Sequence, residues 1–141
     1  MEKIVIYTDG GSRGNPGPAA IGAYIETLGK KYAQTIGKAT NNDAEYQAII
    51  FALKKLRALI GKEKSKKIEV EIRSDSQLII SQLSGVFKIK EMSLGKYFIE
   101  IWNLKQDFGN VGFVHIPREK NAVADQLLNE ALDEKKARAL F

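Results

Sequence analysis

The hydrophobic pattern of the first forty residues predicts three β-strands. The first, residues 4–8, opens with four apolar β-branched or aromatic residues in a row, which is typical of a strand buried on both faces of a sheet. A weaker apolar alternation predicts strands over residues 19–28 and 31–39, joined by a tight turn at Gly29-Lys30. Because such short connections favour antiparallel neighbours, we expect these strands to form an antiparallel meander.

The spacing of apolar residues then changes to that of helices. A first helix is expected to have Asn42 as its N-cap and to stop at Gly61. Further on, the pattern predicts a strand at 68–73, helices at 76–83 and 93–108, a strand at 111–116 and a helix from 119 past 132, with basic links at 61–67 and 84–91.

This order predicts a single α/β domain over residues 1–141. Its five-stranded mixed sheet is expected to be antiparallel at first, then parallel after the crossovers, with helices on both faces. Tyr97 and Trp102 border the apolar stripe of the helix at 93–108, and we expect them to be core residues rather than a base-stacking platform. The tail at 133–141 either extends the last helix or frays.

Composition excludes several classes of protein. The chain has no cysteine and a single histidine, His115, which excludes disulfides, thiolate sites and multi-histidine zinc sites. No apolar run has the length of a membrane span and no signal peptide is recognised, so we expect a cytoplasmic protein without membrane contact. The net charge of +5 favours polyanionic partners.

Four acids fall at unusual places in this pattern. Asp9 and Asp75 each follow a strand, while Glu45 and Asp125 lie on the apolar faces of helices. Taken singly, each has an ordinary interpretation: Asp9 in a glycine-rich turn, Glu45 in a capping box with Asn42, and Asp75 as an N-cap.

If the four carboxylates converge, they would repel one another and raise one another's pKa values. Hard divalent cations such as Mg²⁺ relieve this repulsion, and a pair of them can support hydrolysis of a phosphodiester. A two-metal nuclease site is therefore one interpretation of the pattern.

Four short motifs in order resemble those of the type 1 ribonucleases H: TDGGSRGNPGP, TNNDAE, SDSQ and NAVAD. The resemblance spans nearly the whole chain and implies the ribonuclease H-like fold. It also implies an endonuclease that cuts the RNA strand of an RNA/DNA hybrid, leaving 5′-phosphate and 3′-hydroxyl ends. Two Mg²⁺ or Mn²⁺ ions would be held by Asp9, Glu45, Asp75 and Asp125, and a monomer without an obligate protein partner is expected.

The same motifs imply contacts with the substrate. Amide side chains suit the 2′-hydroxyls that distinguish RNA from DNA, a threonine would hold a phosphate of the DNA strand, and a tight turn of two glycines would let the backbone approach closely. These residues are Asn15, Asn41, Asn42 and Gln77, then Thr40, and finally Gly10 and Gly11. For each asparagine the alternative is turn formation or helix capping.

Two departures from the family pattern affect these expectations. His115 has the spacing of a family histidine that assists proton movement or product release, but it resembles a strand end, and Arg118 is a rival for a phosphate-facing role. The link at 84–91 is too short for the basic protrusion of some members and leaves only Lys88 and Lys90, so we expect weaker, more salt-sensitive binding.

Cleavage of double-stranded RNA and a binding module with a dead site are the alternative functions.

Overall fold

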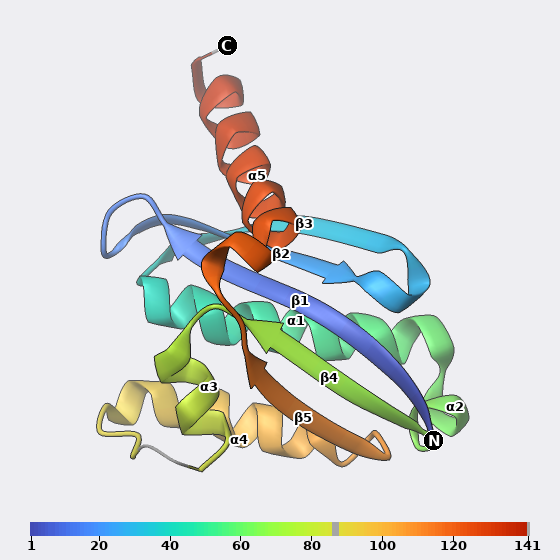
Figure 1. Ribbon diagram of the computed structural model, residues 1–141. Coiled ribbons are helices and arrows are strands. Elements are labelled where there is room, and N and C mark those ends of the chain that lie inside the picture. The colour runs from blue at the N-terminus through green and yellow to red at the C-terminus, as the bar shows by residue number, and fades with distance from the viewer. Residues whose placement is uncertain (86–87, 141) are drawn as a thin grey trace.

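The computed structural model describes residues 1–85 and 88–140. Five strands form one mixed sheet in the order β3-β2-β1-β4-β5 (Figure 1). The first three strands are antiparallel, and β4 and β5 run parallel to β1, as the sequence predicts. Their bounds are β1 Glu2–Ser12, β2 Gly17–Ile25, β3 Lys30–Ala39, β4 Ile68–Ser74 and β5 Asn110–His115.

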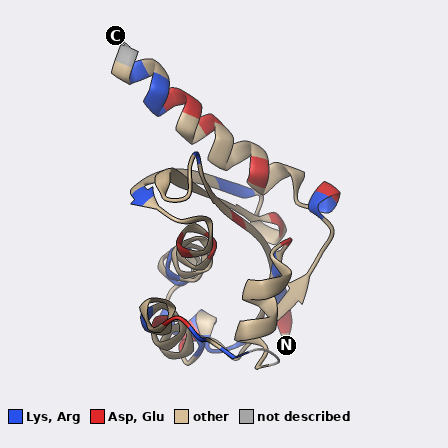
Figure 2. Ribbon diagram, turned by 90° about the vertical axis from the view of Figure 1, so that its left-hand side faces the viewer, with Lys and Arg blue, Asp and Glu red and all other residues tan. Residues whose placement is uncertain are grey.

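Helices cover both faces of the sheet, which confirms the predicted layers. The helices are α1 Asn41–Ile60, α2 Lys62–Ser65, α3 Gln77–Leu83, α4 Met92–Lys105 and α5 Ala122–Leu140. Helices α1, α3 and α4 lie on one face, while α5 crosses the other and projects beyond the sheet (Figures 1 and 2). None of the helices described by the structure is both long and apolar enough to cross a membrane.

The main core lies between the sheet and α1. Alternate residues of β1, Ile4 and Ile6, are fully buried beside Ile72 of β4 and meet Ile49 and Leu53 of α1. These residues follow the period of two expected of strands and the three-to-four spacing expected of helices, so the hydrophobic pattern alone fixes which faces meet.

The first strand is longer than the sequence suggests. It does not end at Asp9 but continues to Ser12, and Gly10 and Gly11 remain paired with Ile21 and Ala20 of β2. The prediction of a tight turn at these two glycines was therefore wrong. The turn follows at residues 13–16, where the glycine- and proline-rich segment leaves the sheet.

Other boundaries also differ in informative ways. The predicted strand at 19–28 ends at Ile25, and a short 3-10 helix, Glu26–Leu28, completes the turn to β3. The link at 61–67 contains the single turn of α2, and Gly61 ends α1 as predicted. The last helix starts at Ala122 after a 3-10 turn at Arg118–Lys120 and continues into the predicted tail as far as Leu140.

One core prediction was wrong. Trp102 is 55% exposed, whereas Tyr97 is half-buried and stacks on the buried Tyr46. Since α4 covers the sheet with only one side, a residue just beside its apolar stripe already faces solvent. Of the link at 84–91, residues 86–87 lie outside the described residues, as does Phe141 of the tail.

Candidate active site

Asp9 lies inside β1, at the point where one edge of that strand becomes open. On one side it is paired with Gly22 of β2. On the other side, β4 pairs with β1 only as far as Tyr7, so among the described residues β1 has no neighbouring strand there from Thr8 onward. Asp75 directly follows the end of β4 and therefore reaches the same open edge.

Two glycines let two acid-bearing helices come close to Asp9. A Cβ at Gly10 would collide with the backbone of Ala44, so the glycine lets the first turn of α1 rest on β1. A Cβ at Gly22 would likewise collide with the backbone of Ala124 in α5. The residues after these contacts are Glu45 and Asp125, so both helices bring an acid toward the Asp9 position.

Glu45 is not used to cap its helix. The N-cap is Thr40, not Asn42, and its capping box is completed by Asp43: the Thr40 hydroxyl accepts from the Asp43 N–H at 3.1 Å, and the Thr40 N–H donates to the Asp43 carboxylate at 3.3 Å. The capping box predicted between Asn42 and Glu45 was therefore wrong, and the Glu45 carboxylate is free to face the core side.

Asp75 is likewise free of a capping role. Ser76 is the N-cap of α3, and its hydroxyl accepts from the N–H of Ile79 at 3.4 Å. The hydroxyl of Ser74 in turn accepts from the N–H of Ser76 at 3.1 Å. The hydroxyls on either side of Asp75 thus serve the helix start, and its half-buried carboxylate faces the cleft.

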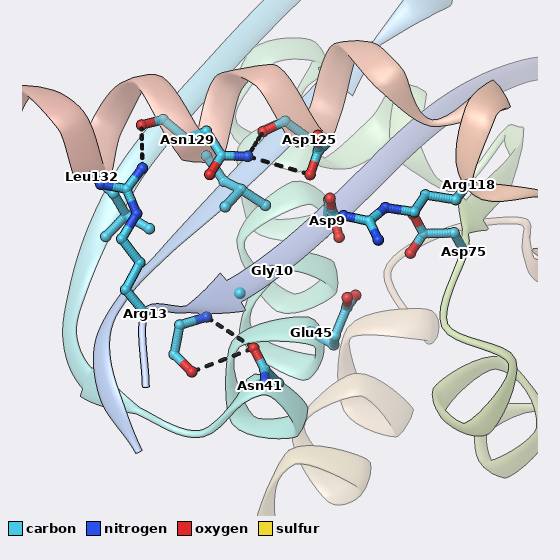
Figure 3. A pocket seen from close by; sticks show the side chains of 13 residues that line it. Asp9, Gly10, Arg13, Asn41, Glu45, Asp75, Arg118, Asp125, Asn129 and Leu132 are labelled. Atoms are coloured by element: carbon cyan, nitrogen blue, oxygen red, sulfur yellow. Dashed lines mark hydrogen bonds between the residues drawn. The ribbon is translucent and has the colours of Figure 1, made fainter. Parts of the chain in front are cut away.

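The carboxylates of Asp9, Glu45 and Asp75 form one group. One oxygen from each lies within 4.8 Å of the others. Asp125 is not part of this group but lines the same cleft of about 420 Å³ and faces it from α5 (Figure 3). The structure thus brings all four predicted acids to one cleft, three of them within reach of a single ion.

The cleft is electrostatically costly without a cation. Burial and, second to it, the nearby Asp75 carboxylate together raise the pKa of Asp9 to about 7. Burial also holds the pKa of Glu45 well above its usual range, with Asp9 as the next cause. Two adjacent buried acids resist losing both protons, which is the condition that a bound divalent cation relieves.

The donor set fits such an ion. Glu45 Oε2 is buried and has no hydrogen-bond partner among the described residues, which is unusual for a carboxylate oxygen. Oxygen atoms of carboxylates are the ligands that Mg²⁺ and Mn²⁺ prefer. Asp9, Glu45 and Asp75 could therefore hold a divalent ion, and Asp125 lines the same cleft.

Asn15 and Asn41 connect the turn after β1 to the start of α1. Asn15 Oδ1 accepts from the backbone N–H of Asn41, and Asn41 Oδ1 accepts from that of Ser12, both at 3.0 Å. Asn41 lines the cleft together with Gly10 and Gly11, whereas Asn15 lies outside it.

The remaining predicted contact residues lie around the cleft. Asn42 lines a neighbouring groove that also contains Lys88 and Lys90. Gln77 is exposed at the first turn of α3. His115 ends β5 in register with Ser74 and is exposed, but only its rival Arg118 lines the acid cleft.

Three polar residues around Asp125 escaped the sequence analysis. Asn121 is buried and donates from Nδ2 to the Thr8 carbonyl at 2.9 Å, which ties the start of α5 to β1. Asn129 donates from Nδ2 to the backbone oxygen of Asp125 at 2.9 Å and to its carboxylate Oδ1 at 3.3 Å. Arg13 lines the cleft from the turn between β1 and β2. The spacing of four residues from Asp125 to Asn129 was the one available signal.

Comparisons with known proteins agree with this geometry. The family model described as "Reverse transcriptase-like" matches residues 8–131. Solved LC11-RNase H1, in complex with an RNA/DNA hybrid, is 49% identical, with a TM-score of 0.86 over 94% of this chain and 98% of that chain. The chain belongs to the ribonuclease H family.

Two curated relatives of this chain are longer. Ribonuclease HI of Halobacterium salinarum is 39% identical over 136 residues, covering 94% of this chain. The bifunctional protein Rv2228c of Mycobacterium tuberculosis is 38% identical over 136 residues, covering 93% of it. The chain spans 65% and 36% of their respective lengths. Both the predicted family and the predicted ribonuclease H-like fold are confirmed.

Proposed function

We propose that the protein is an endonuclease that hydrolyses the RNA strand of RNA/DNA hybrids and leaves 5′-phosphate and 3′-hydroxyl ends. The observation that carries the proposal is the group formed by Asp9, Glu45 and Asp75, with Asp125 facing it, in a chain of the ribonuclease H family. A similar protein, LC11-RNase H1, has been solved with an RNA/DNA hybrid. We further propose that residues 1–141 act as one catalytic domain and as a cytoplasmic monomer.

The four carboxylates would hold two Mg²⁺ or Mn²⁺ ions together with the substrate. Bound there, divalent ions would activate the attacking water and stabilise the leaving oxygen of the phosphodiester. The chain itself supplies the fixed ligands: Asp9 is held within β1, and Glu45 directly follows the capped first turn of α1. Asn129 donates to Oδ1 of Asp125, which leaves Oδ2 of that carboxylate for an ion.

The asparagines beside the cleft are suited to recognise ribose. The bonds of Asn15 and Asn41 to the backbone use their side-chain oxygens and fix both side chains. Their amide N–H groups remain as donors that can reach the 2′-hydroxyl oxygens of the RNA strand. This arrangement favours an RNA strand over a DNA strand in the cleft.

The DNA strand would lie over the groove next to the cleft. Asn42, Lys88 and Lys90 line this groove, and both lysines are exposed. The two lysines could contact phosphates there, whereas the Thr40 hydroxyl would have to exchange its bond to Asp43 for one to a phosphate. Gln77 lies at the exposed start of α3. Such a small basic surface supports the expectation of salt-sensitive binding.

Arg118 is the stronger candidate for a phosphate-facing role near the acids. It lines the cleft that contains Asp75 and Asp125, whereas His115 is exposed outside that lining. A guanidinium can donate two parallel N–H groups to two oxygens of one phosphate, which an imidazole cannot do. We therefore assign substrate binding to Arg118 and leave to His115 an auxiliary role in proton movement or product release.

The proposal is tested with four end-labelled duplexes of one sequence: RNA/DNA, RNA/RNA, DNA/DNA, and DNA with a single ribonucleotide. Each is incubated with the wild type, Asp9→Asn and Glu134→Gln, in Mg²⁺, Mn²⁺ or chelator. Glu134 is exposed on α5, so Glu134→Gln changes the charge equally without touching the cleft. Metal-dependent cutting of the hybrid, lost only in Asp9→Asn, is expected. Cutting of RNA/RNA as well would add double-stranded RNA as a substrate, and no cutting of any duplex would overturn the proposal.

A further inference from the structure

Arg13 is a cation of the cleft wall that the proposed function leaves without a role. It stands in the turn between β1 and β2 and lines the acid cleft, as does Arg118 after β5. Within the described part of the chain these are the two basic side chains of that lining. They lie toward opposite ends of the cleft, with the carboxylates of Asp9 and Glu45 between them (Figure 3).

We propose that Arg13 binds a backbone phosphate of the strand being cut, beside the scissile phosphate and on the side away from Arg118, and that Asp133 holds Arg13 in place until the substrate displaces it. This inference rests on the proposed function, since the carboxylates define where the scissile phosphate lies. Neighbouring phosphates of one strand must then pass along the cleft toward its two ends, where the two arginines stand.

The backbone that carries Arg13 is already fixed. Its own N–H donates to the Pro18 carbonyl at 2.8 Å, closing the turn. The preceding N–H, of Ser12, donates to Asn41 at 3.0 Å, and Asn15 accepts from the N–H of Asn41 at 3.0 Å. Because bonds to α1 hold the turn on both sides of Arg13, substrate binding need not order the loop first.

The present partner of Arg13 holds it only weakly. Arg13 Nη2 lies 2.7 Å from Asp133 Oδ1, and the two side chains are 41% and 68% exposed. The same Nη2 lies 3.5 Å from the backbone oxygen of Asn129, at the limit of a hydrogen bond. Exposed ion pairs contribute little to stability, so a phosphate can compete with Asp133 for the guanidinium.

The guanidinium also has donors to spare. Both contacts use Nη2, which leaves the N–H groups of Nε and Nη1 for a phosphate. A guanidinium binds phosphate through two parallel N–H donors, a geometry that lysine cannot reproduce. Asp133 therefore acts as a counter-ion that orients Arg13 along the wall of the cleft and competes with the substrate.

The alternative is that the pair only fastens α5 to the turn after β1. The two roles predict opposite effects of Asp133→Asn on KM. A fastening pair would be damaged by the loss of either partner, so Arg13→Ala and Asp133→Asn would weaken the enzyme alike. A counter-ion that competes with phosphate predicts opposite effects, because Asp133→Asn releases Arg13 for the substrate.

The experiment measures KM and kcat for hybrid cleavage in Mg²⁺ across a range of salt concentrations, using full-length variants checked for an unchanged Tm. Arg13→Ala is expected to raise KM several-fold with little change in kcat. The slope of log KM against log salt concentration should fall by about one, which is the value for one lost phosphate contact. Arg13→Lys should recover part of the KM and restore the salt slope. Asp133→Asn should lower KM, and this gain should vanish in the Arg13→Ala background.

Arg138→Ala and Glu134→Gln serve as matched controls. These residues form a longer contact of 3.9 Å further along α5 and do not line the cleft. The inference would be overturned if Arg13→Ala had no more effect than Arg138→Ala, or if Asp133→Asn raised KM as Arg13→Ala does. The proposed function would still stand in either case, provided that the wild type cuts the hybrid and Asp9→Asn does not. A wild type that cuts no hybrid would overturn both.

Discussion

The four acids of the cleft divide into an inner and an outer pair. The inner acids, Asp9 and Glu45, are buried and stand on β1 and α1, the elements that build the main core. The outer acids, Asp75 and Asp125, are half-buried and stand where β4 has ended and where α5 has just begun. The electrostatic cost is therefore concentrated on the inner pair, where the pKa of Asp9 is raised to about 7 and that of Glu45 well above its usual range.

This difference separates two tasks within one site. The inner pair cannot move without disturbing the core, so it provides a rigid floor for an ion at the expense of stability in the metal-free protein. The outer pair can adjust to an approaching phosphate because solvent and short polar contacts surround it. The exposure of each acid, rather than its residue type, therefore decides whether its carboxylate destabilises the metal-free protein or can move toward the substrate.

The largest effect is expected from Asp9→Asn, which removes one carboxylate of the inner pair. Removing the central carboxylate should lower the rate of hybrid cleavage by roughly a thousandfold or more, as loss of a residue that acts as part of a unit does. The measurement is single-turnover cleavage in Mg²⁺ and in Mn²⁺, with Glu134→Gln as the control. A loss of less than about tenfold would mean that Asp9 is not a ligand.

The outer pair is tested by Asp75→Asn. Cleavage should again be abolished, because the neutral amide lacks the negative charge with which the carboxylate holds a hard cation. The metal-free protein, however, should keep its fold or become slightly more stable, since Ser76 and not Asp75 caps α3. Urea unfolding in chelator measures this, and a strongly destabilised variant would show instead that Asp75 supports the start of α3.

The inner pair should dominate the pH dependence of stability, with the lowered pKa of Glu71 acting in the opposite sense at the acid end of the range. In the folded protein Asp9 keeps its proton up to about pH 7, whereas in the unfolded chain it loses the proton near its ordinary pKa of 3.8. The folded state therefore binds more protons between these values, and the free energy of unfolding should fall as pH rises from about 4 to about 7. Asp9 accounts for about 4 kcal/mol of this drop, since one pKa unit corresponds to about 1.4 kcal/mol, and the raised pKa of Glu45 adds to it.

Urea unfolding in chelator at several pH values measures this slope. In Asp9→Asn the slope should flatten, and adding Mg²⁺ or Mn²⁺ at pH 8 should stabilise the wild type more than this variant. A metal-free wild type whose stability rises between pH 4 and pH 7 would contradict the electrostatic picture of the inner pair.

Much of this architecture could be predicted from the sequence because periodic hydrophobic residues carry it. Ile4 and Ile6 alternate on β1, and Ile49 and Leu53 recur at helical spacing on α1, so the element types and the mixed sheet could be predicted. The glycines of β1 were misinterpreted for a physical reason. Gly10 normally signals a turn, but here it stays in the strand because α1 comes too close for any side chain.

Positions set by contacts between distant residues could not be predicted in this way. The choice of Thr40 rather than Asn42 as N-cap depends on where β3 ends, and both residue types cap well. The bonds of Asn121 to β1 and of Arg13 to α5 join residues more than a hundred positions apart. No local pattern encodes such pairs, so the acids were found but not the polar residues that orient them.

Asn129→Ala sharpens the comparison on the outer side. Losing the bond to Oδ1 of Asp125 should leave that carboxylate free to rotate and weaken metal affinity or activity by about tenfold, the lower range for residues that orient a ligand. The Mg²⁺ concentration for half-maximal cleavage and calorimetric titration with Mn²⁺ both measure it. The exposed Gln126→Ala, one turn back on α5, is the matched control. Equal metal dependence of the two variants would contradict a positioning role for Asn129.

The smallest expected effect concerns the start of α1, which carries the inner acid Glu45. Thr40→Ala removes one half of the capping box and should lower the free energy of unfolding by about 1 kcal/mol, measured by urea unfolding in chelator. Thr40→Ser keeps a hydroxyl that can accept from the Asp43 N–H and should lose far less. If both variants lost the same stability, the methyl group and not the cap would fasten α1. Because α5 carries Asp125 independently of this cap, the variant loosens one acid of the inner pair and leaves the outer pair in place.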